Sequence, residues 1–186
     1  MKKEVLENKR KSYMDIGEIF FWTATINNWQ RLLQDDHYKN VIISSLEYLS
    51  SESKIDVFAF VIMPNHIHLI WRINALNGKE SPQGSFLKYT AHLFKKKLTE
   101  KDRNKLETYK CDAVNKSYEF WQRDPLAVQL YNKKIAVQKL KYIHNNPLAE
   151  HWQLAIEPSD YKYSSARYYE MNEKTFDFIK DLYDEF

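Results

Sequence analysis

The chain has 186 residues, of which 44% are hydrophobic and 28% are charged, and its formal net charge at pH 7 is +3. These values predict a folded protein of one domain and exclude a largely disordered chain. The single cysteine excludes an internal disulfide and any zinc site built from several cysteines, and it favours a reducing, cytoplasmic setting.

The start of the chain and its glycine content limit the expected partners. Residues 1–17 are highly charged and lack the apolar core of a signal peptide. No apolar run approaches the length that a membrane span needs. The 3 glycines form no loop of the kind that binds nucleotide phosphates. We therefore expect neither a membrane nor a nucleotide cofactor as a partner.

The first half of the chain predicts a strand, a helix and then two strands. Residues 19–26 are β-branched and aromatic, as in a strand, and residues 37–51 repeat their apolar positions at helical spacing. Residues 54–63 are apolar on both faces, which is typical of a central strand. A Pro-Asn dipeptide then makes a tight connection to a third strand at residues 66–73.

The second half of the chain predicts mainly helices. Residues 85–106 place apolar side chains on one face and lysines on the other. Residues 118–122 predict a short strand. Residues 130–146 predict a further helix, which ends before Pro147 because the residue preceding a proline disfavours the α conformation. A mixed, acidic helix is expected at about residues 172–186.

This order of elements predicts an α+β fold. A β-α-β-β-α succession with a short fourth strand indicates a mostly antiparallel sheet with helices packed on it, as in ferredoxin-like folds and RNA-recognition motifs. We find no repeat and no domain boundary, so we expect a single domain over residues 1–186. It would comprise a charged N-terminal segment, about 1–17, and the acidic C-terminal helix.

Two histidines one residue apart are the first candidate site. Side chains alternate in a strand, so His66 and His68 share a face, roughly 7 Å apart along the backbone. At this separation both imidazoles are able to ligate one cation. The alternative is a pair of half-buried histidines whose hydrogen bonds are satisfied within the protein.

The helix at 130–146 offers partners for these histidines. Gln138, Tyr142 and Asn146 are spaced four residues apart and share one helix face. A tyrosine hydroxyl is a competent nucleophile when a cation supports it, and an asparagine oxygen is a neutral metal ligand. Two imidazoles and one amide oxygen leave positions open for water and a phosphate oxygen. Spacing alone does not distinguish this reading from Tyr142 as a core aromatic.

Three segments together resemble a known family. "MPNHIHLIW", then "QKLKYIHNNP", then "YKYSSARYY" look like the single-tyrosine transposases of the His-hydrophobe-His nuclease superfamily, and most like the REP-associated tyrosine transposases. The segments "TATINNWQRLL" and "ISSLEYL" also suit the pattern. The resemblance spans about residues 20–169.

The resemblance implies a site and a reaction. His66 and His68 would be metal ligands, Tyr142 the nucleophile on a helix in the C-terminal half of the chain, and Asn146 the third ligand. The reaction would be cleavage and rejoining of single-stranded DNA through a 5′-phosphotyrosine, with Mg²⁺ or Mn²⁺ as cofactor and a hairpin such as a REP element as target.

The chain departs from the patterns of its relatives in two places. Some small insertion-sequence relatives carry glutamine at the position of Asn146, whereas asparagine suits the REP-associated branch. After "NNP" that branch usually continues with a valine and a glycine-containing turn, but this chain has "LAEHW". The departure affects the expected loop and leaves the expected site intact.

Basic and aromatic side chains are candidates for contact with DNA. Basic residues able to neutralise phosphates are Lys95, Lys96, Lys97, Arg123, Lys133, Lys134, Lys139 and Lys141. The alternative for each is a solvated helix face. Trp71 and Trp121 are candidates for base stacking, but Trp71 points away from the histidines and is better explained by core packing.

Other functions remain open at this point. A replication initiator or relaxase of the same superfamily would use the same residues, although such proteins usually carry further domains. A domesticated, non-catalytic DNA-binding protein would need none of the four site residues. A metal hydrolase would use water in place of Tyr142. The sequence does not distinguish a monomer from a homodimer.

Overall fold

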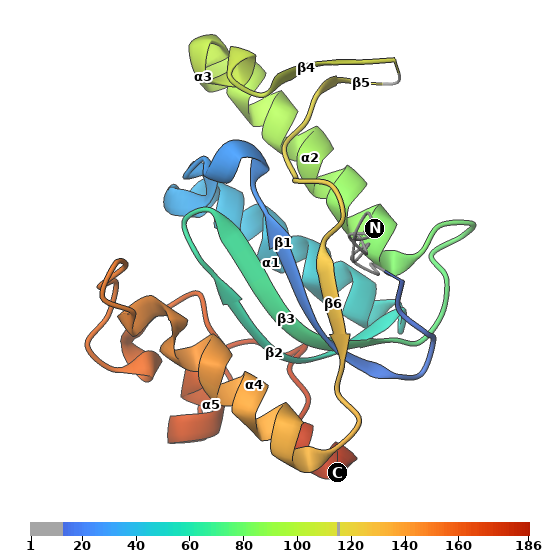
Figure 1. Ribbon diagram of the computed structural model, residues 1–186, viewed down its shortest axis with the longest axis vertical. Helices are drawn as coiled ribbons and strands as arrows, with labels where there is room; N and C mark the ends of the chain where they lie inside the picture. Colours follow the sequence, from blue (N-terminus) through green and yellow to red (C-terminus); the bar gives the residue numbers. More distant parts are fainter. Residues whose placement is uncertain (1–12, 115) are drawn as a thin grey trace, which may run out of the picture.

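A four-stranded antiparallel sheet forms the centre of the molecule (Figure 1). The computed structural model describes residues 13–114 and 116–186, so most of the predicted N-terminal segment lies outside the described residues. The strands run in the order β2-β3-β1-β6. They are β1 (Ile19–Thr25), β2 (Ile55–Ile62), β3 (His66–Ile73) and β6 (Leu126–Gln129). This arrangement confirms the predicted α+β class, with an antiparallel sheet and packed helices.

The central strand β3 carries both histidines of the candidate site. It pairs with β1 and β2, and in the β1 register Thr23 lies opposite His68 and Thr25 opposite His66. All of its side chains except Arg72 are buried, because helices cover both faces of the sheet. Alternation along β3 therefore decides which helices each side chain meets.

One face of the sheet is covered by α1 (Asp36–Ser51) and α2 (Pro82–Lys101). The Asp35 side chain caps α1 and the Ser81 side chain caps α2, as expected for residues that accept from free helix N–H groups. An aromatic core lies beneath: the Trp22 ring is 5.0 Å from that of Trp71 and 5.9 Å from that of Phe86. The predicted core position of Trp71 is confirmed.

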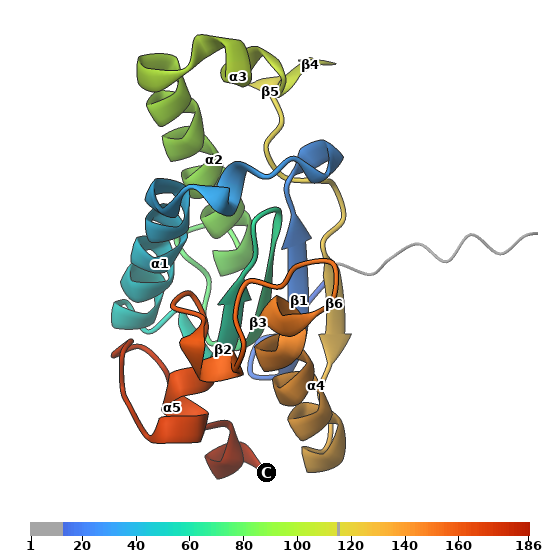
Figure 2. The ribbon, with the colours of Figure 1, turned by 90° about the vertical axis from the view of Figure 1, so that its left-hand side faces the viewer.

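The opposite face is covered by α4 (Lys133–Asn145), which contacts β2 and β3. In Figure 2, α1 and α4 lie on opposite sides of the sheet. The helix starts three residues later than predicted, because Leu130 still follows the sheet and its N–H bonds to the carbonyl of Ile19. The Asn132 side chain caps the first turn by accepting from the N–H of Ile135.

The end of α2 and the segment after it project away from the sheet (Figure 1). The helix predicted at 85–106 is in fact two helices, α2 and α3 (Arg103–Glu107), because Asp102 is non-helical and caps α3. A short hairpin follows, formed by β4 (Lys110–Ala113) and β5 (Lys116–Tyr118).

The strand predicted at 118–122 is not the fourth strand of the central sheet. β5 ends at Tyr118, and Trp121 makes only an isolated bridge to Ile26. The fourth strand is β6, whose four largely exposed residues give too weak a pattern to be predicted. Trp121 is buried and its indole N–H donates to Thr90 Oγ1, so its predicted role in base stacking is wrong.

The C-terminal part covers the free edge of β2. The N–H of Ile62 bonds to the carbonyl of Tyr163, and the N–H of Ser165 to that of Phe60. The "YKYSSARYY" segment, residues 161–169, directly follows η4 (Pro158–Asp160) and ends within α5 (Ala166–Met171). An uncovered edge strand invites pairing with other chains, so this segment is a packing element that protects β2.

The acidic C-terminal helix predicted at about 172–186 is wrong. After α5 the chain forms only a short 3₁₀ turn, η5 (Leu182–Glu185). Phe176 and Phe178, two residues apart, both pack against Phe60, a spacing that suits extended chain better than a helix. Ile179 then forms a parallel bridge to Val57, which continues the cover of β2.

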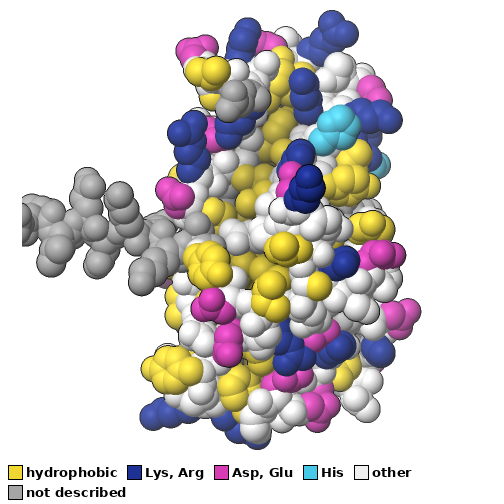
Figure 3. All heavy atoms as spheres, turned by 90° about the vertical axis from the view of Figure 1, so that its right-hand side faces the viewer, with side chains coloured by type: hydrophobic (Ala, Val, Ile, Leu, Met, Phe, Trp, Pro, Cys, Tyr) yellow, Lys and Arg dark blue, Asp and Glu magenta, His cyan; other side chains and the backbone are white. Residues whose placement is uncertain are grey.

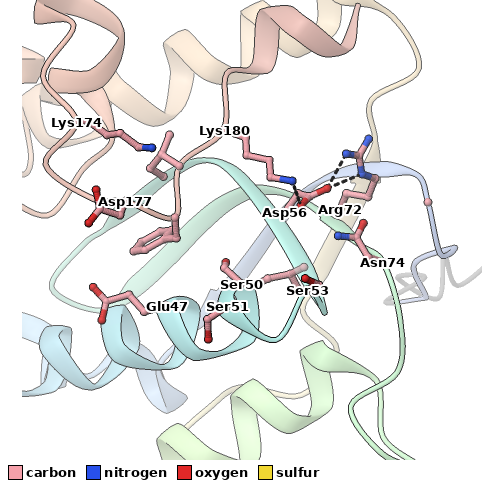
Figure 4. A pocket seen from close by; sticks show the side chains of 14 residues that line it. Glu47, Ser50, Ser51, Ser53, Asp56, Arg72, Asn74, Lys174, Asp177 and Lys180 are labelled. Atoms are coloured by element: carbon pink, nitrogen blue, oxygen red, sulfur yellow. Dashed lines mark hydrogen bonds and ion pairs between the residues drawn. The ribbon is translucent and has the colours of Figure 1, made fainter.

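The C-terminal segment is also held by ion pairs. A hollow of about 1010 Å³ lies between it and α1 (Figure 4). In this hollow Asp56 is paired with Arg72 and Lys180, each at 2.6 Å, and Arg72 is also paired with Glu185 at 2.6 Å. Because these charges already neutralise one another, they stabilise the fold and do not form a candidate site.

Acid should weaken this network. Burial of Asp56 favours its neutral form, but the hydrogen bonds from Lys180 and Arg72 together outweigh burial and lower the pKa of the carboxyl below its usual value. The charged form therefore stabilises the fold above the unfolded-state pKa of about 4. That stabilisation is lost as the pH falls through the lower folded-state pKa.

We therefore expect Asp56→Asn to lower the free energy of unfolding by about 1.5–3 kcal/mol at pH 7. The difference from the wild type should shrink below about pH 4. Urea denaturation at pH 7 and at lower pH measures both effects. Asp177→Asn is the matched control, since Asp177 lines the same hollow and makes no ion pair within the described residues. Equal stability of wild type and Asp56→Asn at pH 7 would contradict this role.

None of the helices in the described part of the chain is both long enough and apolar enough for a bilayer crossing.

Candidate active site

The sheet brings His66 and His68 together on the face that α4 covers. Their ring centroids are 4.6 Å apart, and both residues are buried, with exposed fractions of 8% and 5%. The rings lie beside Thr23 and Thr25 of the neighbouring strand β1. The predicted shared face is therefore confirmed, and the two imidazoles are close enough for a common ligand.

One nitrogen of each imidazole is held by a hydrogen bond. Nδ1 of His66 donates to Asn65 Oδ1 at 2.7 Å, and Nδ1 of His68 is 2.7 Å from Thr23 Oγ1. Such bonds fix the orientation of a ring and leave its Nε2 for another partner, as is usual for histidines that ligate metals. The two rings are therefore pre-oriented before anything binds.

Both histidines are neutral at pH 7. Burial lowers the pKa of His66 to about 4, although the Asn146 side chain acts in the opposite direction. Burial also lowers the pKa of His68 well below its usual value, and repulsion from the protonated form of His66 and from the Lys139 ammonium acts in the same direction. A neutral imidazole is the form that ligates a cation.

Helix α4 and the turn that follows it place Tyr142 and Asn146 beside this pair; Tyr142 is within the helix, and Asn146 is the residue that caps its C-terminal end. The apolar positions Ala136, Leu140 and Ile143 are buried against the core, so Tyr142 lies at the edge of the covered face, next to the histidines. The Tyr142 ring centroid is 5.3 Å from that of His68, yet 48% of Tyr142 is exposed. Tyr142 is therefore not an ordinary core aromatic.

Two buried polar atoms in this region have no hydrogen-bond partner among the described residues. They are Nε2 of His68 and Oδ1 of Asn146. Buried polar atoms are nearly always satisfied, so a pair of orphans in one cleft points to a missing ligand. Asn146 Oδ1 carries lone pairs, and Nε2 of His68 carries one in the tautomer whose Nδ1 donates to Thr23, so a cation would satisfy both.

The candidate donor set is a mixed one. Within the described residues, no group of three or more His, Cys, Asp or Glu is placed to hold a metal ion. A cation at this position would depend on two imidazole nitrogens and an amide oxygen. This set leaves other positions of an octahedral ion open, and it fits Mg²⁺ or Mn²⁺ when water and phosphate oxygens complete the shell.

An open cleft of about 550 Å³ runs between the sheet and α4 over these groups. Its walls include Gln138 and Tyr142 on α4 and Asn146 directly after the helix, which are the three residues predicted to share a face, together with Trp29 and Trp152. A second hollow of about 380 Å³ adjoins it, with Thr23, Thr25, Trp29, His68 and Tyr142 as shared walls. The histidines and the tyrosine thus lie where two open spaces meet.

Three of the predicted basic residues lie at this cleft. Lys141 lines the first hollow, and Arg123 and Lys139 line the second. The Lys139 ammonium is 4.6 Å from the ring centroid of Phe21 and 5.5 Å from that of Tyr142. Such contact with aromatic faces holds the cation beside the tyrosine.

The other predicted basic residues lie elsewhere. Lys133 contacts the C-terminal end of the chain, including the carbonyl of Phe186, and Lys134 is exposed on the first turn of α4. Lys95, Lys96 and Lys97 are on α2, on the other side of the sheet, where Lys95 lies over the Tyr118 ring. Figure 3 shows basic side chains on this projecting end with acidic ones between them. The predicted residues therefore do not form one continuous basic surface.

Three further residues belong to the site although the sequence predicts no role for them in it: Thr23, Asn65 and Trp29. Thr23 and Thr25 are two residues apart in an otherwise apolar strand, so their side chains share one face of the sheet. Two hydroxyls on one face indicate a polar partner there. Asn65 directly precedes the histidines but was interpreted only as a turn residue. Trp29 follows β1 and has no pattern that singles it out.

Comparison with known proteins supports a shared fold. No protein-family model and no curated protein matches the chain. A solved structure of a REP-associated tyrosine transposase bound to a REP hairpin matches over 90% of this chain and 87% of that chain, with a TM-score of 0.60 and 17% identity. The resemblance of the sequence motifs is thereby confirmed at the level of the fold.

A second structural match is weaker. It is described as a "putative transposase from deinococcus radiodurans r1", with a TM-score of 0.40 and 15% identity over 78% of this chain and 97% of that chain.

The bond from Thr23 to His68 gives a test of the candidate metal site. We expect Thr23→Val, which removes the hydroxyl at nearly constant volume, to weaken Mn²⁺ binding by about 10–100-fold. Isothermal titration calorimetry measures the change. Thr25→Val is the matched control, because Thr25 lines the same cleft on the same strand. An unchanged affinity in Thr23→Val would show that the bond does not orient a metal ligand.

Proposed function

We propose that this protein is a metal-dependent, single-stranded DNA endonuclease and transposase, and that Tyr142 is its nucleophile. One observation supports this best: a half-exposed tyrosine lies 5.3 Å, between ring centroids, from a neutral, buried histidine whose Nε2 has no partner. A core aromatic would not be exposed, and a structural histidine would have its second nitrogen bonded.

The residues present suit a divalent cation. His66, His68 and Asn146 would hold Mg²⁺ or Mn²⁺. When bound, the ion would draw charge from a non-bridging phosphate oxygen and so stabilise the transition state. The protein's own contribution is a set of neutral, pre-oriented ligands, which the hydrogen bonds that the two imidazoles donate to Asn65 and Thr23 support.

The proposed reaction is a transesterification at Tyr142. The phenolic oxygen attacks the scissile phosphorus, a bond forms between Oη and phosphorus, and the bond from phosphorus to the 3′ oxygen breaks. The phenolic proton passes to solvent water, to which the half-exposed Tyr142 is open, and the 3′ oxygen takes up a proton from water to become a free 3′-hydroxyl. The 5′-phosphotyrosine retains the energy of the phosphodiester, so attack by a 3′-hydroxyl rejoins DNA without ATP.

The substrate is proposed to be single-stranded DNA beside a hairpin. The relative of known structure is bound to a REP hairpin, and we extend that partner to this chain. Arg123, Lys139 and Lys141 line the cleft and would neutralise phosphates of the strand that crosses Tyr142. An unpaired strand is required because a duplex holds its phosphates on a wide, stiff helix that does not follow a cleft.

The decisive experiment detects a covalent adduct. We expect wild-type protein, Mn²⁺ and single-stranded DNA labelled at its 3′ end to give a labelled adduct stable in SDS. Tyr142→Phe should lower the yield by at least about 1,000-fold, since the nucleophile is lost. His66→Ala combined with His68→Ala, or EDTA, should do the same and leave most DNA binding intact. Tyr131→Phe, at an exposed tyrosine outside the cleft, is the matched control.

Each other result identifies a different function. Adduct formation by Tyr142→Phe would assign the nucleophile elsewhere. Cleavage without any adduct, equal in wild type and Tyr142→Phe, would identify a hydrolase that uses water. Binding of DNA with no cleavage under any metal would identify a domesticated DNA-binding protein. Equal adduct yield on fully paired DNA would contradict the single-stranded substrate.

A further inference from the structure

Trp29 is exposed in a way that the fold does not explain. It lies in the short 3₁₀ turn η1 (Asn27–Trp29), directly after β1, and 61% of the residue is exposed. Trp22, Trp71 and Trp121 are all buried in the core. A large aromatic side chain gains stability from burial, so an exposed one at the wall of a cleft suggests a role in binding.

The backbone holds Trp29 in an unfavourable conformation. Asn28 has φ 54° and Trp29 has φ 56°, so two successive residues with side chains occupy the left-handed region. Such conformations cost free energy and persist when the surroundings enforce them. Here the N–H of Trp29 bonds to the carbonyl of Ile26 at 2.9 Å, and the Trp29 carbonyl accepts from Asn65 Nδ2 at 3.4 Å.

Asn65 connects this turn to the candidate metal site. Its Oδ1 accepts from Nδ1 of His66 at 2.7 Å, and its Nδ2 donates to the Trp29 carbonyl. One amide therefore orients a histidine and fixes the turn that carries the tryptophan. The backbone of the same residue adds to this link, since the Asn65 carbonyl accepts from the N–H of Ile26 at 2.8 Å.

Trp29 lies at the junction of the two hollows. It lines both the hollow of about 550 Å³ and that of about 380 Å³, together with His68 and Tyr142. A strand whose phosphate reaches Tyr142 must place nucleotides on both sides of that residue. Lys141 on one side and Arg123 on the other supply positive charge for their phosphates.

Trp152, the other tryptophan of the cleft, is already engaged. The Arg31 guanidinium lies 5.2 Å from the centroid of its ring, and the His66 ring lies 6.0 Å away. Trp152 is half-buried, so it forms part of the wall. Within the described residues, Trp29 is thus the tryptophan of the cleft that is open to a planar ligand.

We infer that Trp29 is a stacking platform for the nucleobase next to the phosphate that reaches Tyr142. This inference rests on the proposed function and specifies the ligand of the same site. Stacking on an indole tolerates any base, because every base presents a π face. It would hold the strand in register over the histidines, while recognition of sequence would come from other contacts.

The test compares two ligands with equal numbers of phosphates. Binding of a short oligothymidine and of an abasic oligomer of the same length is measured by fluorescence anisotropy, with Tyr142→Phe protein in EDTA. We expect oligothymidine to bind roughly 5- to 100-fold more tightly. Trp29→Ala should remove most of that preference and leave the affinity for the abasic oligomer unchanged, and Trp29→Phe should retain part of it.

The controls separate stacking from a change in folding. Tyr48→Ala removes a similarly exposed aromatic from α1, on the other face of the sheet, and should leave the preference intact. Quenching of indole fluorescence by oligothymidine, present in Tyr142→Phe protein and reduced when Trp29→Phe is added, does not depend on the alanine variant folding. An unchanged preference in Trp29→Ala, or unchanged quenching in Trp29→Phe, would overturn the inference.

The outcomes distinguish this inference from the proposed function. If wild-type protein forms the covalent adduct but Trp29→Ala keeps the full preference for oligothymidine, the platform is wrong and the function stands. If the preference depends on Trp29 but no adduct forms under any metal, the nuclease function is wrong and the platform stands. If neither oligomer binds and no adduct forms under any metal, both are wrong.

Discussion

The pairing of β1 with β3 is the constraint on which the candidate site depends. The register sets Thr23 opposite His68, which places a hydroxyl 2.7 Å from Nδ1 of that ring. A slip of one residue would turn both histidines toward the aromatic core beneath α1 and α2. Because Trp22 and Trp71 fill that core, the register is fixed by packing on one face of the sheet and used for polar groups on the other.

The second requirement is a helix that stays on the histidine face. The buried apolar stripe of α4 holds it against the sheet, and His144 at its last turn bonds through Nε2 to Ser165 Oγ. Ser165 also accepts from the N–H of Phe60 on β2. The segment that protects the β2 edge is therefore in direct contact with the helix that carries Tyr142, so the C-terminal part of the chain supports the site without lining it.

Two unsatisfied polar atoms and a strained turn lie around the same cleft. The two orphan atoms, His68 Nε2 and Asn146 Oδ1, are unfavourable in the protein alone. The backbone at Asn28 and Trp29 is left-handed. The Asn65 side chain links this turn to the site, because it bonds to the Trp29 carbonyl and to Nδ1 of His66. Unsatisfied polar atoms and strained backbone around one cleft are typical of binding sites, where contacts with the ligand offset their free-energy cost.

The sequence predicted the parts that depend on local pattern. The strand at 66–73 has the predicted bounds, since its alternation and flanking dipeptide are local signals. The helix face of Tyr142 and Asn146 follows from spacing alone. Thr23 and Trp29 required the strand register and the path of a turn, which a single sequence does not encode locally. The helix predicted at the C-terminal end is absent because Phe176 and Phe178 pack on β2 and Ile179 bridges it, contacts with a distant strand that no local pattern encodes.

The central claim is that His66, His68 and Asn146 form a cation site beside Tyr142. A crystal structure with Mn²⁺, using the anomalous signal of the metal, tests it most directly. We predict one manganese peak in the cleft, about 2.0–2.4 Å from Nε2 of both histidines and from Oδ1 of Asn146. A structure with no manganese in the cleft, and with Nε2 of His68 bonded to another protein group, would contradict the account.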